Sequence, residues 1–507
     1  MNVLSAFISV SGWTLASRVL GLVRDIIVAF IFGAGALMDA FFAAFRLPNT
    51  LRRFTAEGAL TQAFVPAYQK AKETNPEEAA AFAGELLCLL ALSLAVLSAL
   101  VIIAAPQVIA IVAPGLEQAE AAADMLRIVF PYILLISIVA LFSGILNADY
   151  RFRAAAAAPI FLNIAVIVAA LWRPSSLMPQ ETALAWGVMV GGILQLALTG
   201  FCVRRAGLSP RLRLRYPGAR IKTALYKMGQ SALGAGAIQI NLLINLAIAS
   251  LLPAGAISWL YYADRLMELP AGLLGAALST VVLPAMSVGG TRAHTVLDNA
   301  LRLAMVLSLP AACGMVILAF PIVSVLFLRG AFDWHDAQMT AHAVSAYGVG
   351  ILGLVALRPL AAAFFARGDA ATPAKVAVIA LLMTQVFNGI FVFLLEWNHA
   401  GIALSIGLAA TLNAVILLWL LRRRSWYEPL KGWGRLLACM LGGVAFMGVF
   451  LWAGQPAEEF WREQSLLARI TALFGLGIVG SGVYFGVLWA GGVRFSDFRT
   501  GDLKSPD

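Results

Sequence analysis

The sequence predicts an all-α polytopic membrane protein with about fourteen transmembrane helices, and three observations lead to this fold class. The 507 residues are 61% hydrophobic and 12% charged, with a mean hydropathy of +0.88. Apolar stretches of about 20 residues, the length that crosses a bilayer as a helix, recur from one end to the other. The alternation of apolar and polar residues that is typical of a transmembrane β-barrel is not visible.

The predicted helices are separated by segments rich in glycine and proline, such as "APGLEQAE", "LLPAGAIS" and "RGDAATPAK". The first apolar segment is too long, and too interrupted by Arg18 and Arg24, for a cleaved signal peptide, so we expect a retained helix. The predicted spans are, in order, residues 3–32, 38–70, 77–112, 120–147, 154–172, 182–203, 221–252, 256–287, 294–328, 336–366, 373–396, 400–421, 433–453 and 465–491.

The distribution of basic residues predicts the orientation of these helices. One set of loops, together with the C-terminal tail, carries about 24 Lys and Arg residues, including those of "RRAGLSPRLRLRYPGARIK" and "RRRSWYEPLKGWGR". The opposite set carries about three, Arg173, Arg329 and Arg462. The basic loops and both termini are therefore expected in the cytoplasm. Because these loops are short and adjoin the membrane, the net charge of +10 favours contact with anionic lipids over nucleic acid.

An internal repeat predicts how the helices are grouped. Phe41–Ala43 matches Tyr261–Ala263 at an offset of 220, and "ALTQAFVP" from Ala59 matches "ALSTVVLP" from Ala277 at an offset of 218. Chance similarity in an apolar chain is the alternative. We interpret the repeat as two six-helix lobes, residues 1–215 and 216–428. Residues 429–507 then supply two further helices and a cytoplasmic tail. Repeated lobes commonly enclose a substrate site at their interface.

Residues that would indicate catalysis or metal binding do not cluster. The sequence has no P-loop, HExxH motif or nucleophile elbow. The four cysteines stand alone in apolar runs and the four histidines show no metal-ligand spacing. We therefore predict no catalytic residue, no metal and no cofactor. The residues in question are Cys88, Cys202, Cys313, Cys439, His294, His335, His342 and His399.

About nine basic residues lie within predicted spans, where a charge is costly and usually functional, and four of them are of most interest: Arg18, Arg24, Arg52 and Arg265. At about 1.5 Å per residue, Arg24 and Arg265 lie roughly 12 and 14 Å from the outer ends of their helices, and Arg18 and Arg52 roughly 21 and 22 Å. If the helix faces converge, four guanidinium groups surround one cavity near the middle of the membrane. Guanidinium groups bind phosphate as a bidentate fork, so such a cavity suits a diphosphate and repels a cation.

Internal salt bridges are the alternative explanation for these arginines. Glu57 lies one helical turn after Arg53, and Asp264 and Glu268 flank Arg265. The nearby acidic residues are Asp25, Asp39, Glu57, Asp264 and Glu268, and the arginines number six once Arg46 and Arg53 are included. A positive excess remains. Asp25 could neutralise an arginine in one conformation and release it in another.

Several long motifs resemble the MurJ (MviN) family of lipid II flippases, within the multidrug/oligosaccharidyl-lipid/polysaccharide exporter superfamily. These are "SRVLGLVRD", "FGAGALMDAFFAAFRLPNTLRRFTAEGALTQAFVP", "FPYILLIS", "SWLYYADRLMELP" and "LSIGLAATLN". The resemblance implies fourteen helices in two lobes around a V-shaped cavity. It also implies alternating access that carries lipid-linked peptidoglycan precursor from the inner to the outer leaflet of the bacterial cytoplasmic membrane, for cell wall synthesis.

The resemblance also implies roles for particular residues. The family's essential cavity arginines match Arg18, Arg24, Arg52 and Arg265, and its gating or cavity-lining positions match Asp39, Glu57 and Ser258. Family members can have lysine at the position of Arg46, so the resemblance implies only a positive charge there. Helices beyond about residue 430 are expected to form a groove for the polyprenyl tail. Sodium coupling has been proposed for some members through carboxylates, but here the corresponding helices offer only Asn241, Asn245 and Asn388, which favours coupling to the membrane potential.

The predicted function is thus a flippase for lipid II, an undecaprenyl-diphosphate glycopeptide, and not an enzyme. A drug/cation antiporter of the same superfamily would need acidic residues without arginines in its cavity, so the excess of arginines argues against this alternative. A membrane enzyme acting on lipid-linked sugars would need a carboxylate pair, a metal cluster or an activated nucleophile. We expect a monomer in contact with membrane lipids, and cell-wall synthesis proteins are left open as partners.

Overall fold

The computed structural model describes residues 3–52, 60–172, 179–212, 218–288 and 290–494. These residues form helices and connecting segments, with an isolated bridge between Arg329 and Phe332. Among them, eleven helices are long and apolar enough to cross a membrane. The chain is therefore an all-helical, multi-pass membrane protein, and the fold class expected from the sequence is confirmed at that level.

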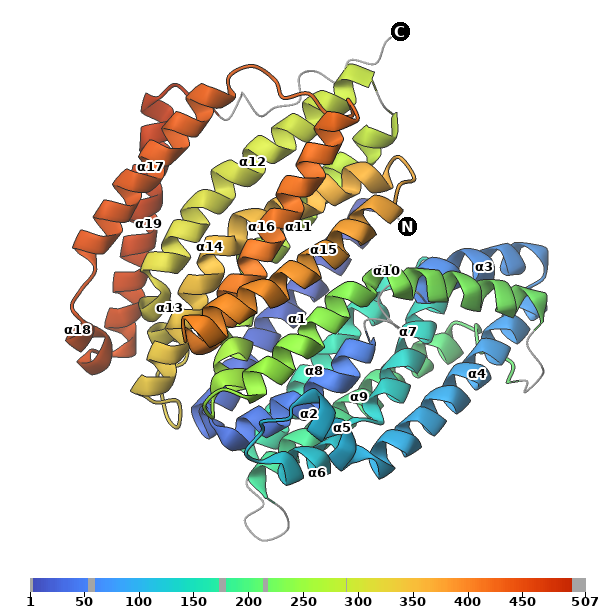
Figure 1. Ribbon diagram of the computed structural model, residues 1–507. Coiled ribbons are helices and arrows are strands. Elements are labelled where there is room, and N and C mark those ends of the chain that lie inside the picture. The colour runs from blue at the N-terminus through green and yellow to red at the C-terminus, as the bar shows by residue number, and fades with distance from the viewer. Residues whose placement is uncertain (1–2, 53–59, 173–178, 213–217, 289, 495–507) are drawn as a thin grey trace. The chain divides into compact units, whose positions relative to one another are not determined.

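The chain divides into two compact units, Met1–Ser258 and Trp259–Asp507. The first contains α1 (Val3–Phe32), α2 (Ala36–Arg52), α3 (Leu60–Thr74), α4 (Pro76–Ile103), α5 (Ala105–Val112), α6 (Ala119–Val129), α7 (Tyr132–Ala148), α8 (Phe152–Leu171), α9 (Gln180–Arg205) and α10 (Ala219–Ser250), followed by the start of α11 (Ala256–Val288). The second contains the rest of α11, α12 (Gly290–Ile317), α13 (Ala319–Leu326), α14 (Trp334–Phe365), α15 (Ala371–Asn388), η2 (Gly389–Leu394), α16 (Asn398–Arg423), α17 (Trp433–Gly454), α18 (Glu458–Glu463) and α19 (Leu466–Ala490) (Figure 1).

Several predicted spans are interrupted where the backbone cannot continue its hydrogen bonding. The span predicted at 77–112 divides into α4 and α5 beside Pro106, and the span at 120–147 divides into α6 and α7 at Pro131. Proline has no N–H group to donate, so a break or kink forms at such positions. The predicted spans 3–32, 38–70 and 221–252 are not among the eleven candidate spans. The first carries Arg18, Arg24 and Asp25, and the second crosses residues outside the described part.

In the first unit, α8 packs against α1 and α9, and α7 packs against α3, α4 and α9. The side chains buried between α3, α4 and α7 include Phe64, Tyr68 and Phe82, and the ring of Phe64 stacks on that of Phe82 with centroids 5.6 Å apart. The separate contact between α1 and α8 places α1, which carries two of the candidate arginines, beside α8.

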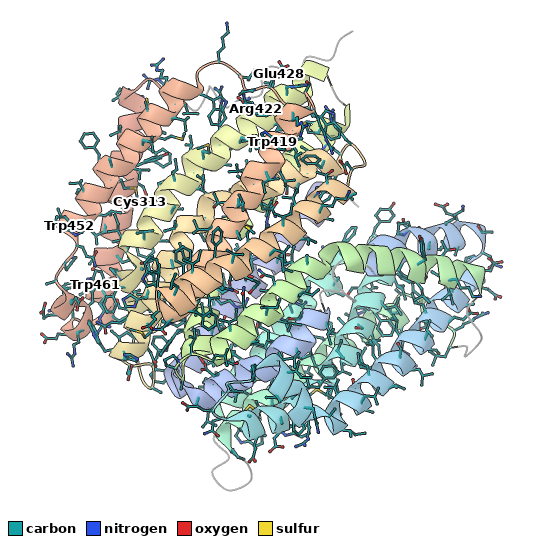
Figure 2. The ribbon with its side chains drawn as sticks, in the orientation of Figure 1. Cys313, Trp419, Arg422, Glu428, Trp452 and Trp461 are labelled. Carbon is teal, nitrogen blue, oxygen red and sulfur yellow. The ribbon has the colours of Figure 1, made fainter. Side chains whose placement is uncertain are left out.

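In the second unit, α14 packs against α12 and α16, and α17 pairs with α19. A Cβ atom on Gly350 would overlap the backbone of Gly407, so glycine at both positions lets α14 and α16 approach closely. The core around α12, α17 and α19 contains Cys313 and Trp461, whereas Trp452 is 77% exposed and points away from the helices (Figure 2).

A buried carboxylate positions the start of α17. Asp298 on α12 accepts hydrogen bonds from the Tyr427 hydroxyl (2.6 Å), the Leu430 backbone N–H (3.2 Å) and the Trp433 indole N–H (2.8 Å), and it pairs with Arg302 at 2.6 Å. The segment between α16 and α17 is therefore fastened to α12. This contact sets where the last pair of long helices begins.

Candidate functional site

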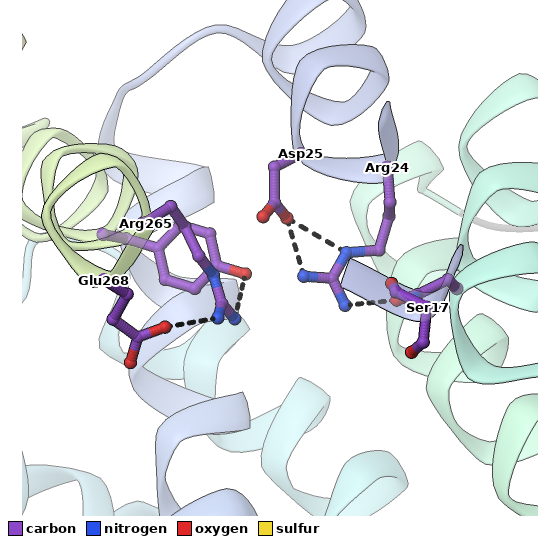
Figure 3. Close-up of polar contacts among 7 residues, drawn as sticks. Ser17, Arg24, Asp25, Arg265 and Glu268 are labelled. Carbon is purple, nitrogen blue, oxygen red and sulfur yellow. Dashed lines mark hydrogen bonds and ion pairs between the residues drawn. The ribbon is translucent and has the colours of Figure 1, made fainter. Parts of the chain in front are cut away.

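Arg24 and Asp25 form a buried ion pair in α1. The Nε and Nη2 atoms of Arg24 both donate to Oδ1 of Asp25, at 3.0 and 2.7 Å, and the two side chains are only 10% and 4% exposed. The third donor, Nη1, reaches Oδ1 of Asn163 on α8 at 3.1 Å (Figure 3). Asn163 in turn donates to the Ser17 carbonyl at 3.1 Å. The guanidinium group is thus oriented by two helices and neutralised by its neighbour in sequence.

The remaining candidates of the first unit lie on α1 and α2. Arg18 is exposed, one and a half turns before Arg24. Arg46 is half-buried on α2, and so is Arg52, whose Nε donates to Oδ1 of Asn49 at 3.2 Å. Arg53 and Glu57 lie outside the described residues, so their predicted pairing stays a prediction.

Asp39 binds the N-terminus of α11. Its Oδ2 accepts from the Gly255 N–H at 2.7 Å, and its Oδ1 accepts from the Ser258 N–H at 2.8 Å and the Ser258 hydroxyl at 2.6 Å. Gly255 adopts a φ of +99°, which places its N–H toward the carboxylate at low conformational cost. The carboxylate therefore caps α11 from another helix, where the positive end of the helix dipole stabilises a negative charge.

In the second unit, Arg265 is half-buried and held by its own helix. Its Nη1 donates to Oε2 of Glu268 at 3.3 Å, its Nη2 donates to the Tyr261 hydroxyl at 3.2 Å, and its Cζ lies 5.0 Å from the centroid of the Tyr261 ring. These contacts are drawn with those of Arg24 in Figure 3. Asp264, the other predicted acid, is half-buried beside it in sequence.

Sequence reasoning identified the charged residues but missed three that orient them, Asn163, Asn49 and Tyr261. Asn163 had a visible signal, because it is a single amide within the apolar span 154–172. Tyr261 was noted only as part of the repeat. Among the described residues, no group of three or more His, Cys, Asp or Glu side chains could hold a metal ion.

Comparison with known proteins gives a consistent result. The family model "Lipid II flippase MurJ" matches residues 28–471. The chain is 40% identical to the lipid II flippase MurJ of Burkholderia cenocepacia, over 98% of this chain and 99% of that protein. It is 34% identical to the probable lipid II flippase MurJ of Vibrio cholerae, over 98% of both chains.

Comparison with solved structures points to the same family. The structure described as lipid II flippase MurJ in an inward closed conformation superposes with a TM-score of 0.80 and 25% identity, covering 95% of this chain and 100% of that one. An inward-facing multidrug resistance transporter of the MATE family, from the MOP superfamily, shares the fold with a TM-score of 0.71 at 16% identity, covering 82% of this chain and 97% of that one. The chain belongs to the MurJ family of lipid II flippases.

Proposed function

We propose that this protein translocates lipid II from the inner to the outer leaflet of the cytoplasmic membrane, and that Arg18, Arg24, Arg52 and Arg265 bind the diphosphate of the substrate. Its apolar helices and its family make it a multi-pass protein of the bacterial inner membrane. A flippase forms and breaks no covalent bond, so the protein is not an enzyme and its family activity requires no cofactor.

The observation that carries the proposal is the buried Arg24 guanidinium, fixed by Asp25 and Asn163. A buried ion pair gives little net stability relative to apolar side chains, because both charges must be removed from water. Retaining one within a membrane helix therefore supports a functional role. A diphosphate carries more negative charge than the Asp25 carboxylate, so it can compete with Asp25 for the N–H groups of Arg24.

The mechanism follows from this competition. In the structure, Asp25 pairs with Arg24 and Glu268 pairs with Arg265. In the proposed cycle the diphosphate replaces these carboxylates, the two lobes rock around it, and the carboxylates recapture the arginines once the headgroup leaves. Asp39, Ser258, Arg46, Arg53, Glu57 and Asp264 would line or gate the path. The polyprenyl tail would stay in lipid, against α17 and α19.

The finer features are part of the same proposal. Fourteen spans would form two six-helix lobes, residues 1–215 and 216–428, with residues 429–507 forming the tail groove and a cytoplasmic tail. Both termini would be cytoplasmic, the protein would act as a monomer, and the membrane potential would drive the cycle. Co-purification of the protein from cells measures whether it binds cell-wall synthesis proteins.

The test is an assay of lipid II accessibility at the outer surface of cells that depend on this protein. Single Arg→Ala variants at positions 18, 24, 52 and 265 should abolish translocation, whereas Arg→Lys variants should keep part of it because the charge remains but the fork is lost. Arg205→Ala, at the end of α9, is the control and should translocate normally. Normal translocation in all four alanine variants would refute the proposal.

A further inference from the structure

A groove in the first unit, lined by none of the candidate substrate-binding or gating residues, has the form of a lipid site. It has a volume of about 690 Å³ and lies between α4, α7 and α9. The side chains that line it are Leu87, Cys88, Ala91, Ile138, Phe142, Leu196, Ala197, Gly200, Phe201, Arg204 and Leu212. This volume is that of an ordinary ligand pocket.

The groove lies on helices with exposed apolar side chains. Phe201, which lines it, is 62% exposed, and Leu92 on α4 and Ile193 on α9 are 55% and 53% exposed. On candidate membrane spans such side chains face lipid tails. Small residues, Ala91, Ala197 and Gly200, keep the groove open.

One end of the groove is basic. Arg204, in the last turn of α9, is the one charged residue among the lining side chains. Its side chain is exposed and forms no hydrogen bond or ion pair with another residue of the described chain. From Leu196 to Arg204 the groove follows α9 for about 12 Å. The apolar part of the groove suits an acyl chain, and the guanidinium group of Arg204 at its end suits a phosphate.

The segment that follows α9, residues 206–212 (the strap), packs against the start of α4. The Arg211 N–H donates to the Ala80 carbonyl at 2.9 Å, and the Arg211 guanidinium pairs with Glu77 at 3.1 Å. A Cβ atom on Gly84 would overlap the Arg211 carbonyl, so only glycine lets the strap lie so close to α4. Leu212 of the strap is among the side chains that line the groove. The strap therefore contributes to the groove together with α4, α7 and α9.

We propose that this groove binds an anionic glycerophospholipid of the cytoplasmic leaflet, with one acyl chain along α9 and its phosphate at Arg204. An anionic headgroup is favoured because a zwitterionic lipid carries its own cation, which competes with Arg204 for the phosphate. The bound lipid would be a structural cofactor of the first unit, separate from the transported substrate.

Native mass spectrometry of the full-length protein, with phosphatidylglycerol or phosphatidylcholine added, measures this binding. The protein should retain phosphatidylglycerol preferentially, and Arg204→Gln should weaken retention about fivefold. Gly200→Leu should also weaken it, because its Cβ meets only Phe142, at 3.4 Å, and its methyl groups would fill the groove. Arg205→Gln, one residue further along and not in the groove, is the control. Equal retention in Arg204→Gln, Gly200→Leu and the control would overturn the proposal.

Cys88 offers a second measurement that leaves every side chain lining the groove unchanged. In a protein with Cys202, Cys313 and Cys439 replaced by alanine, phosphatidylglycerol should slow maleimide labelling of Cys88 several-fold, and phosphatidylcholine should not. Labelling that is unaffected by phosphatidylglycerol would contradict the proposal. So would stronger protection by a polyprenyl phosphate, because the groove would then hold the isoprenoid tail.

Discussion

Arg24 contacts a carboxylate and an amide, and the two contacts have different consequences for stability and for substrate binding. Asp25 neutralises the positive charge of Arg24, and the hydrogen bond to Asn163 orients the guanidinium group. Removing one member of a buried pair leaves the other charge unpaired, which costs about 3–5 kcal/mol. Removing both avoids most of that cost but also removes the phosphate donor.

We therefore predict different results from Arg24→Ala and from Arg24→Ala with Asp25→Ala. The single variant should unfold at a clearly lower temperature, and the double variant should unfold near the temperature of the unmodified protein. Neither should translocate lipid II. Thermal unfolding of the purified proteins and the accessibility assay measure the two effects. A double variant that is stable and still translocates would show that Arg24 only balances Asp25.

At this scale the sequence indicated the charged residues and their acidic neighbours, but not the amide of Asn163 that orients Arg24. The depths of Arg24 and Arg265 could be estimated by counting residues along a helix. The contact between Arg24 and Asn163 joins residues 139 positions apart, so it depends on how α1 packs against α8. The pairing of Arg265 with Glu268 could be predicted from the sequence, because the two residues are three positions apart on one helix.

Among the elements, α2 and α11 are joined through one carboxylate. Asp39 satisfies two backbone N–H groups and a hydroxyl at the start of α11. Helix caps contribute about 0.5–2 kcal/mol, and an unsatisfied buried donor costs about 1–3 kcal/mol.

We predict that Asp39→Ala lowers the thermal unfolding midpoint more than Ser258→Ala does. The first variant removes all three bonds, whereas the second removes only the hydroxyl bond and keeps the cap. Asp39→Asn should lie between them because it keeps an acceptor and loses the charge. The same midpoint for Asp39→Ala and Ser258→Ala would mean that the cap does not stabilise α11.

The segment between α16 and α17 gives a second prediction about elements. Asp298→Ala should speed hydrogen exchange of residues 424–432, because the Leu430 N–H loses its acceptor and Tyr427 and Trp433 lose theirs. Asp369→Ala is the control, since it breaks an ion pair with Arg424 at the other end of the same segment but leaves Asp298 in place. Unchanged exchange in Asp298→Ala would show that the segment is held by other contacts.

For the molecule as a whole, hydropathy predicted the helical membrane fold because the bilayer leaves the backbone few alternatives. Hydropathy did not predict the breaks at Pro106 and Pro131, since it measures how apolar a residue is and not whether its backbone can donate a hydrogen bond. The charge asymmetry of the loops predicts orientation. Single cysteines introduced at Lys431 and at Glu459, in an otherwise cysteine-free protein, should be labelled by an impermeant reagent from outside the cell only at Glu459. The opposite labelling would invert the proposed topology.

The central claim is that four arginines bind one diphosphate, and binding of undecaprenyl diphosphate to the purified protein tests it most directly. Each hydrogen bond to a charged group contributes about 1.5–3 kcal/mol, so each of Arg18→Ala, Arg24→Ala, Arg52→Ala and Arg265→Ala should weaken binding at least about tenfold. Undecaprenyl alcohol, which lacks the diphosphate, should bind all five proteins equally. Diphosphate affinity that is unchanged in all four variants would contradict the account.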